Sequence, residues 1–97
     1  MYRIRYTAVY RIWYKKLKDK HARAKISDHI DRMRGGNLGN TRNVGDGIFE
    51  KKINFAGGFR LYYFFKLENQ IILLHGGDKS TQQKDIEKAK EIKKGIL

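Results

Sequence analysis

Two segments of alternating residue type carry cationic and aromatic side chains that could bind a nucleic acid. In residues 48–55, Lys52 falls on the face opposite the aromatic and aliphatic side chains, and in residues 59–65 the same alternation separates Arg60 and Tyr62 from the other face. Successive side chains of a strand point to opposite faces. If the two strands are neighbours, these three residues form one basic and aromatic surface. Cations hold phosphates and aromatic rings stack on unpaired bases, so this surface favours RNA as a ligand.

The same residues also allow a plainer interpretation. They can be ordinary cross-strand neighbours, with Glu50 forming a surface salt bridge to Lys52 or Arg60 that contributes little stability. Lys51 falls on the apolar side of its strand, which predicts a β-bulge or an edge position there. On the residues alone, both interpretations of this surface stay open.

The histidines do not supply a second catalytic arrangement. His75 falls in a different predicted element from His21 and His29, and no acidic residue is spaced to form a catalytic pair with any of the three. Only His75, at a predicted strand end before a Gly76-Gly77 turn, would lie near the basic surface. The sequence contains no HExxH, paired DxD or Cys/His ligand spacing, and it has no cysteine. It therefore predicts a site without a metal or another cofactor.

RNA can be cleaved without a metal. Its own 2′-OH attacks the adjacent phosphorus once a base removes the proton, and cations stabilise the phosphorane that forms. Neighbouring positive charges lower the pKa of a lysine, so a lysine in a basic cluster can act as the base. DNA lacks the 2′-OH and would be spared.

Net charge supports an anionic partner. The 97 residues include 22 Lys and Arg against 10 Asp and Glu, a net charge of +12. This self-repulsion favours nucleic acid first and an anionic membrane surface second, with charge kept only for solubility as the remaining alternative. No segment has the segregated faces of a membrane-surface helix, no apolar run approaches the ~18–20 residues of a membrane span, and no signal peptide is present. We expect a soluble, cytoplasmic protein that does not bind a membrane.

The hydrophobic pattern predicts one α+β domain in which a strand, two helices, three strands and a final helix follow one another. Residues 2–6 alternate as a strand, and Thr7 and Asp19 are predicted N-caps of two helices that form an antiparallel hairpin. The second helix is expected to end at Gly35-Gly36. Residues 35–47, rich in Gly and Asn, are predicted to be a loop.

The second half is predicted to be an antiparallel meander followed by a helix. Its strands are residues 48–55, 59–65 and 70–75, joined by turns at residues 56–58 and 68–69. A capping box at residues 80–83 is expected to begin the last helix, and Gly95 to end it. The helices need one apolar face of the antiparallel sheet to cover, which would leave the face with Lys52, Arg60 and Tyr62 open.

Several short motifs then occur in a familiar order. Residues 73–90 read LLHGGDKSTQQKDIEKAK, and they are preceded by Gly36-Asn37 with Gly39-Asn40, by residues 44–47 (VGDG), and by residues 50–53 (EKKI) leading to residues 58–63 (GFRLYY). Together, from about Tyr2 to Lys94, the chain resembles the HigB-like, phage-derived addiction module killer branch of the RelE/ParE toxin superfamily.

This resemblance implies a RelE-like domain over residues 1–97 with the element order predicted above. It also implies the toxin of a type II toxin–antitoxin system, a ribosome-dependent messenger-RNA endonuclease that inhibits translation. The implied partners are the ribosome, messenger RNA and a cognate antitoxin, in this branch usually a HigA-like helix-turn-helix protein. We expect the toxin alone to be monomeric and to form a hetero-oligomer with the antitoxin.

The resemblance also assigns residues. Lys52, Arg60 and Lys79 are the implied catalytic residues, with Lys52 as base and Arg60 stabilising the phosphorane. Lys79 is expected to bind a phosphate, and Arg42, in the predicted loop, is added as a second phosphate contact. The residues expected to bind RNA are Arg42, Lys51, Tyr62, His75 and Asp78.

Two departures from the family leave choices open. The family commonly has an apolar residue where Lys51 stands, so either Lys51 or Lys52 can be the functional lysine. The C-terminal tyrosine of some relatives has no match here, which leaves Lys79, Tyr62 and His75 as candidates for the general acid.

Two other functions compete with the RNase. A ParE-like gyrase poison would share the fold, but it has no need of a cationic catalytic pocket, and it would induce the DNA-damage response without messenger cleavage. A non-catalytic RNA-binding module would bind with a steep salt dependence and release no product.

Overall fold

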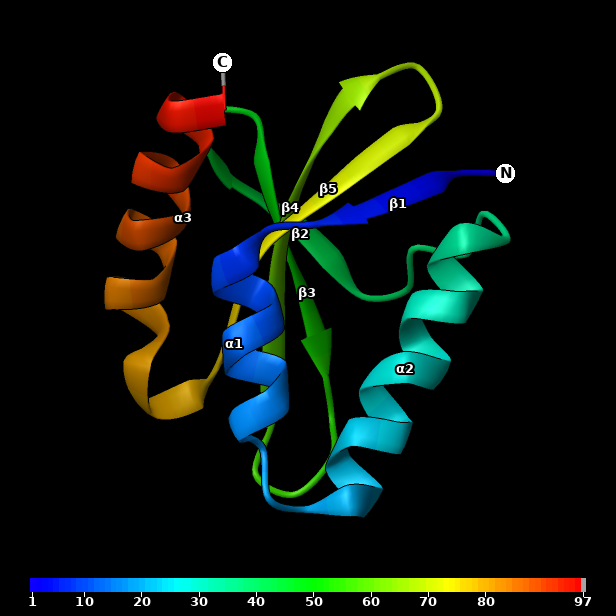
Figure 1. Cartoon of the computed structure of the whole chain (residues 1–97), viewed down its shortest axis with the longest axis vertical. Helices are drawn as coiled ribbons and strands as arrows, with labels where there is room; N and C mark the ends of the chain where they lie inside the picture. The colour runs from blue at the N-terminus through cyan, green and yellow to red at the C-terminus, as the bar shows by residue number, and fades with distance from the viewer. Residues whose placement is uncertain (97) are drawn as a thin grey trace.

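The computed structural model describes residues 1–96 and confirms the predicted α+β class (Figure 1). In chain order its elements are β1 (Arg3–Tyr6), α1 (Ala8–Lys16), α2 (Lys20–Arg34), β2 (Thr41–Gly45), β3 (Ile48–Ile53), β4 (Phe59–Leu67), β5 (Gln70–Asp78) and α3 (Gln82–Ile96), with a short 3-10 turn at Lys79–Thr81. The two N-terminal helices run in opposite directions, as predicted, and diverge from the connection between them (Figure 1). None of the helices within residues 1–96 has the length and apolar character that a membrane crossing requires.

The five strands form one sheet in the order β1-β5-β4-β3-β2. The pairs β2–β3, β3–β4 and β4–β5 are antiparallel, as the meander predicted. The pair β1–β5 is parallel, so β1 joins the predicted antiparallel meander in the parallel sense at this edge.

β2, the second strand in chain order and an edge strand of the sheet, lies inside the segment that was predicted to be a loop. It pairs with β3 so that Thr41 faces Lys51 and Arg42 faces Glu50, with an irregularity between Asn43 and Gly45. The glycines and asparagines of this segment concealed the strand, because they lower strand propensity. The backbone of β3 nevertheless offers hydrogen-bonding groups that β2 satisfies at the sheet edge.

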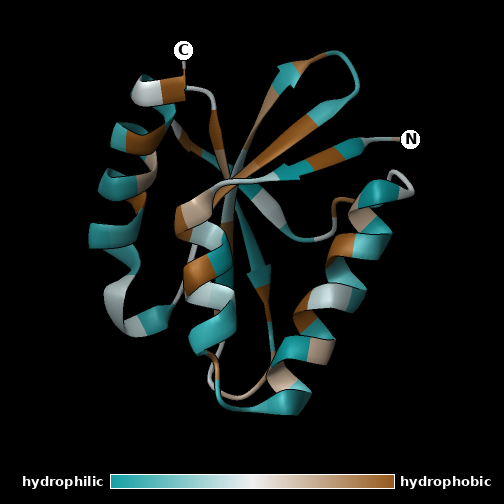
Figure 2. Ribbon diagram, in the orientation of Figure 1, coloured by the Kyte–Doolittle hydropathy of each residue, from teal (hydrophilic) through white to brown (hydrophobic). Residues whose placement is uncertain are grey.

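Helices cover both faces of the sheet, so the expectation of one open face was wrong. On one face, α1 and α2 pack against the sheet around a core of Tyr10, Ile26, Ile30, Met33, Ile53, Leu61, Tyr63, Ile71 and Leu73. On the other, α3 packs over Ile48, Tyr62, Phe64, Ile72 and Leu74 with its own Ile86 and Ala89. Apolar residues accordingly recur along β5 and along the helices, where the ribbon is brown (Figure 2). Both faces of the central strands are buried because both carry apolar side chains.

The glycine pair of the GGDKSTQ motif lies within β5, not in a turn after it. A Cβ on Gly76 would lie 2.3 Å from the ring of Trp13 in α1, and a Cβ on Gly77 would lie 1.9 Å from a carboxylate oxygen of Asp85 in α3. The two glycines face opposite sides of the strand. They let one helix approach the sheet closely on each face.

The helix ends follow the predictions in part. Thr7 Oγ1 accepts a hydrogen bond from the Tyr10 amide at 3.0 Å, and Asp19 caps α2 as expected. The predicted capping box at Ser80 is wrong, because the carboxylate of Asp78 accepts the Ser80 amide at 2.8 Å and opens the 3-10 turn instead. Gly95 lies inside α3 and does not end it.

Candidate functional site

Lys52 and Arg60 are the centre of a basic groove, as their strand positions suggested. They are register partners across β3 and β4 on the face that α3 covers only in part. A hollow of about 370 Å³ between them and Lys79 is closed at one end by the β3–β4 turn. A second hollow, of about 290 Å³, shares Lys52 and Arg60 and is completed by Asn40, Arg42, Glu50 and Gln82. We call the two together the basic groove.

Five different elements bring these side chains together. β3 and β4 supply Lys52 and Arg60, while Lys79 stands on the exposed 3-10 turn that follows β5. Arg42 comes from β2, the strand hidden in the predicted loop, and Gln82 is the first residue of α3.

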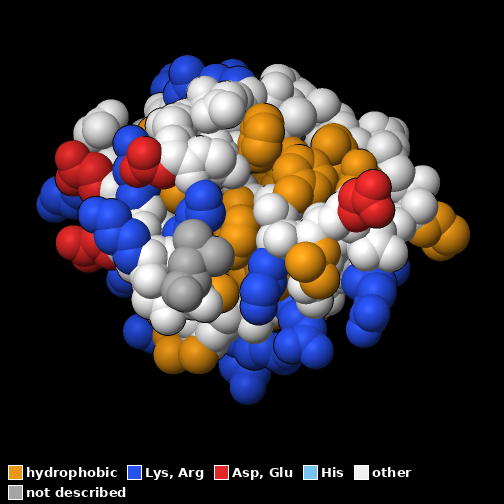
Figure 3. Space-filling model, turned by 90° about the horizontal axis from the view of Figure 1, so that it is seen from above, with side chains coloured by type: hydrophobic (Ala, Val, Ile, Leu, Met, Phe, Trp, Pro, Cys, Tyr) orange, Lys and Arg blue, Asp and Glu red, His pale blue; other side chains and the backbone are white. Residues whose placement is uncertain are grey.

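Basic side chains are not confined to the groove. At the end of the molecule that carries the β4–β5 turn, Lys and Arg side chains surround a group of apolar side chains (Figure 3). The net charge of +12 is therefore spread over the surface. What distinguishes the basic groove is the arrangement of its charges.

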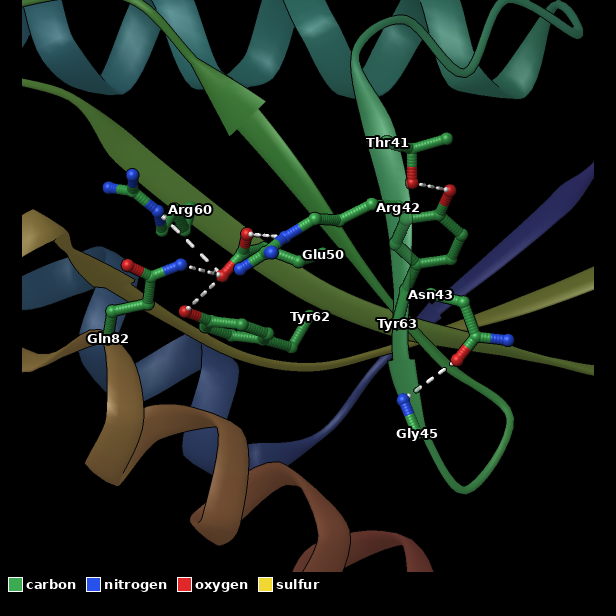
Figure 4. A network of polar contacts seen from close by, with 9 residues as sticks. All are labelled: Thr41, Arg42, Asn43, Gly45, Glu50, Arg60, Tyr62, Tyr63 and Gln82. Carbon is green, nitrogen blue, oxygen red and sulfur yellow. Dashed lines mark hydrogen bonds and ion pairs between the residues drawn. The ribbon is translucent and has the colours of Figure 1, made fainter.

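A buried carboxylate, Glu50, organises one end of the groove (Figure 4). Arg42 Nε donates to Glu50 Oε1 at 2.9 Å, and Gln82 Nε2 and Tyr62 Oη donate to Oε2 at 2.8 and 3.1 Å. Only 4% of the residue is exposed. Burial alone would raise the pKa of Glu50, but the hydrogen bonds from Gln82, Arg42 and Tyr62 outweigh it, so the pKa lies below its ordinary value. Glu50 is therefore ionised at neutral pH, and the expected surface salt bridge is a buried cluster.

Arg60 is the exception in this cluster. Its Nε lies 3.7 Å from Glu50 Oε2, which is an ion-pair distance but too long for a hydrogen bond. The residue is 6% exposed, and nothing within residues 1–96 hydrogen-bonds its Nε or Nη1. Buried donors in native proteins almost always have partners. A guanidinium with free donors in a groove lined by other cations is suited to an anion such as a phosphate.

The four other residues expected to bind RNA do not line the two hollows of the groove; they are Lys51, Tyr62, His75 and Asp78. Lys51 points to the opposite face of the sheet, where it is 1% exposed and its Nζ donates to the Leu38 carbonyl at 2.7 Å. Burial, and then the charge of Arg32, lower the pKa of Lys51. β3 is an interior strand with regular pairing at this residue, so the predicted bulge or edge is wrong. Lys51 is accommodated because its ammonium reaches the chain segment before β2.

Tyr62 lies beneath α3 with no exposed surface, and burial followed by the charge of Glu50 raises the pKa of its hydroxyl. It cannot stack on a base in this position, and it serves as a donor to Glu50. Asp78 is exposed, but its carboxylate is occupied by the amide and hydroxyl of Ser80. A hydrogen bond from Ser80 is the main cause that lowers the pKa of Asp78.

His75 has an acidic partner, contrary to the prediction from sequence. Its Nε2 lies 3.0 Å from an oxygen of Asp85, whose other oxygen accepts from Thr81 Oγ1 at 2.6 Å. Burial lowers the pKa of His75, the hydrogen bond to the Asp85 carboxylate opposes this, and the net shift is downward. The imidazole is therefore neutral near pH 7 and lies inside the fold, 8% exposed.

Sequence reasoning missed Gln82 and the central role of Glu50. The predicted ion pair of Glu50 with Arg60 is present, but its hydrogen-bond partners Arg42, Tyr62 and Gln82 were not foreseen. No group of three or more His, Cys, Asp or Glu side chains that could hold a metal ion occurs within residues 1–96.

Comparison with known proteins assigns the chain to a family. The family model described as Phage derived protein Gp49-like (DUF891) matches residues 12–94. The chain belongs to the Gp49-like family. The Gp49-like match spans every side chain named above for the basic groove. A protein of Haemophilus influenzae described only as "Uncharacterized protein" is 47% identical over 91 residues, which is 90% of this chain and 88% of that protein. No solved structure matches the chain.

Proposed function

We propose that this Gp49-like protein is an RNA endonuclease, the toxin of a type II toxin–antitoxin system, and that it cleaves messenger RNA on the ribosome. The observation that carries the proposal is Arg60, a buried guanidinium with free donors at the centre of a groove lined by Lys52, Lys79 and Arg42. The resemblance to HigB-like toxins, in motifs that contribute Lys52, Arg60 and Lys79, supports the same chemistry.

In the proposed reaction the substrate supplies its own nucleophile. Lys52 accepts the proton of the 2′-OH, and the 2′-oxygen attacks the adjacent phosphorus. Arg60 donates to the non-bridging oxygens as negative charge develops on the phosphorane, which is where preorganised donors contribute most. The bond from phosphorus to the 5′-oxygen breaks, and the products end in a 2′,3′-cyclic phosphate and a 5′-hydroxyl.

The leaving 5′-oxygen needs a proton, and Lys79 is the donor we favour. It is exposed and lines the same hollow as Lys52 and Arg60. The other two candidates, Tyr62 and His75, are buried beneath α3, and the hydroxyl of Tyr62 already donates to Glu50.

Glu50 has a positioning role in this proposal. As a carboxylate with a lowered pKa and three hydrogen-bond donors, it is a poor base. It holds Arg42 at the rim and keeps a negative charge near Arg60, which compensates the buried guanidinium without using its donors. We further propose that a cognate helix-turn-helix antitoxin forms a hetero-oligomer with a monomeric toxin and neutralises it.

Primer extension on a defined messenger RNA, with and without translating ribosomes, tests the proposal. We expect discrete cuts within codons only when ribosomes are present, and their loss in Arg60→Met. The matched control is Arg34→Met, which removes an arginine of α2 that pairs with Asp31. Intact messenger with the unmodified protein would refute the RNase, and induction of the DNA-damage response in the same cells would then favour gyrase as the target.

A further inference from the structure

The two hollows of the basic groove differ in chemistry. The hollow at the β3–β4 turn is lined by Lys52, Lys79 and Arg60 with a glycine-containing turn. The other hollow shares Lys52 and Arg60 and adds Arg42, but it also contains the Glu50 carboxylate and two amide side chains, those of Asn40 and Gln82. The Glu50 carboxylate repels a phosphate, and an amide oxygen can only accept a hydrogen bond, which a base can donate and an ionised phosphate cannot, so this part of the second hollow is suited to another part of a nucleic acid.

We propose that the second hollow is a nucleobase subsite in which Gln82 recognises the edge of a base next to the cleaved phosphate. This inference rests on the proposed RNase function. The ligand is one unpaired base of the RNA, and the residues that bind it are Arg42 and Gln82.

The orientation of the Gln82 amide is set by its neighbour. An ionised carboxylate can only accept hydrogen bonds, so the Gln82 NH₂ must face Glu50, which it does at 2.8 Å. The carbonyl oxygen of the amide then points away from Glu50, as the close view shows (Figure 4). Gln82 thus offers the groove a fixed hydrogen-bond acceptor.

Arg42 provides a flat surface beside this acceptor. Its Nε is held by Glu50 Oε1 at 2.9 Å, while 62% of its side chain is exposed. A guanidinium plane restrained in this way can stack on an unpaired base. One buried carboxylate therefore positions both the stacking plane and the acceptor.

A fixed acceptor discriminates among bases by their donors. Adenine, cytosine and guanine present an exocyclic amino group, whereas the ring N–H of uracil lies between two carbonyl oxygens that repel an acceptor. Loss of one such hydrogen bond corresponds to roughly a twofold to tenfold change in preference. We therefore expect cuts with uracil at one position beside the cleaved phosphate to be depleted by about that factor.

The test is the base composition around each cut in the ribosome-dependent primer-extension assay, for the unmodified protein, Gln82→Met and Gln83→Met. Methionine keeps the length of glutamine but removes the acceptor, and Gln83 is the adjacent, exposed glutamine that serves as the control. We expect Gln82→Met to cut without the depletion of uracil, and Gln83→Met to retain it.

Several results would overturn the subsite. The subsite is overturned if the unmodified protein shows no base preference, or if Gln82→Met shows the same preference as the unmodified protein. It is also overturned if a folded Gln82→Met does not cut at all, because Gln82 would then have a role in the reaction itself. Absence of any cutting by the unmodified protein is a different result, because it refutes the proposed RNase.

If Gln82→Met does not fold, the unmodified protein is given messengers with inosine in place of guanosine or purine riboside in place of adenosine. Cutting at the substituted position should fall about twofold to tenfold, and equal cutting overturns the subsite.

Discussion

Replacement of Arg60 by methionine should separate stability from ligand binding. In most proteins a buried arginine is held by several hydrogen bonds, and its removal leaves buried partners without compensation. Arg60 has two buried nitrogens without partners, and Glu50, its salt-bridge partner, retains Arg42, Tyr62 and Gln82. Arg60→Met fills similar space with an apolar side chain and leaves no new unpaired carboxylate.

Two opposing contributions set the change in the free energy of unfolding of Arg60→Met. Each unsatisfied buried donor costs about 1–3 kcal/mol, and methionine removes both. The lost attraction to Glu50 over 3.7 Å is about 4 kcal/mol at an effective dielectric constant of about 20. These terms are of similar size, so the free energy of unfolding should stay within about 2 kcal/mol of the unmodified value.

Ligand binding should respond in a different way. Phosphate at ten times its dissociation constant raises the free energy of unfolding by about 1.4 kcal/mol, which corresponds to roughly 6–11 °C in Tm for a domain of this size. We expect this rise in the unmodified protein and in Arg34→Met, but not in Arg60→Met. Thermal melts are compared in phosphate and in chloride at equal ionic strength, because phosphate also strengthens apolar burial without binding.

Two outcomes would refute this reasoning. A loss of more than about 3 kcal/mol in Arg60→Met would mean that the guanidinium is needed for the fold, as in a buried ion pair that has been broken. An equal phosphate-dependent rise in Arg60→Met and the unmodified protein would mean that the anion binds elsewhere.

Three further predictions concern the scaffold. Gly76→Ala should lower the free energy of unfolding, measured in urea, by about 1–3 kcal/mol, because the new Cβ would lie 2.3 Å from the Trp13 ring. In the control Gly35→Ala the new Cβ has ordinary contacts, so its stability should not fall in this way. Equal stabilities of the two variants would contradict the packing argument. Burial lowers the pKa of His75 below 6.5, so the stability from its neutral form is present above pH 6.5 and is lost as pH falls from there through the folded pKa. Urea titrations at pH 7.5 and 5.5 should therefore show a larger loss for the unmodified protein than for His75→Gln, by at most ~1.4 kcal/mol per pH unit, and parallel losses would contradict it. Thr7→Ala should lose about 1–2 kcal/mol in the same assay, since it removes the cap of α1, while Thr7→Ser should retain most of it.

Much of the fold follows from periodicity, and the failures have identifiable causes. The four apolar positions of α2, Ala22, Ile26, Ile30 and Met33, are all buried as their spacing predicted. β2 was missed because its pairing with β3 is a tertiary interaction that outweighs poor strand propensity. The second covered face was missed because no local pattern tells which side of a sheet a C-terminal helix will choose.

The candidate site was predictable where it depends on strand neighbours. Lys52 and Arg60 are partners across one turn, so alternation alone brings them together. Gln82 and the pair of His75 with Asp85 depend on how α3 docks, which sequence spacing does not specify. Lys79 needed the resemblance, since nothing in its own segment distinguishes it from other exposed lysines.

Glu50 explains why Arg60 keeps its donors free. Three donors already occupy the two carboxylate oxygens of Glu50 at 2.8–3.1 Å, two of them on Oε2, the oxygen nearest Arg60. Arg60 is a fourth potential donor to this carboxylate. Its Nε lies 3.7 Å from Glu50 Oε2, so it is attracted by the negative charge but forms no hydrogen bond. The competition therefore compensates the buried positive charge and leaves its N–H groups for a ligand.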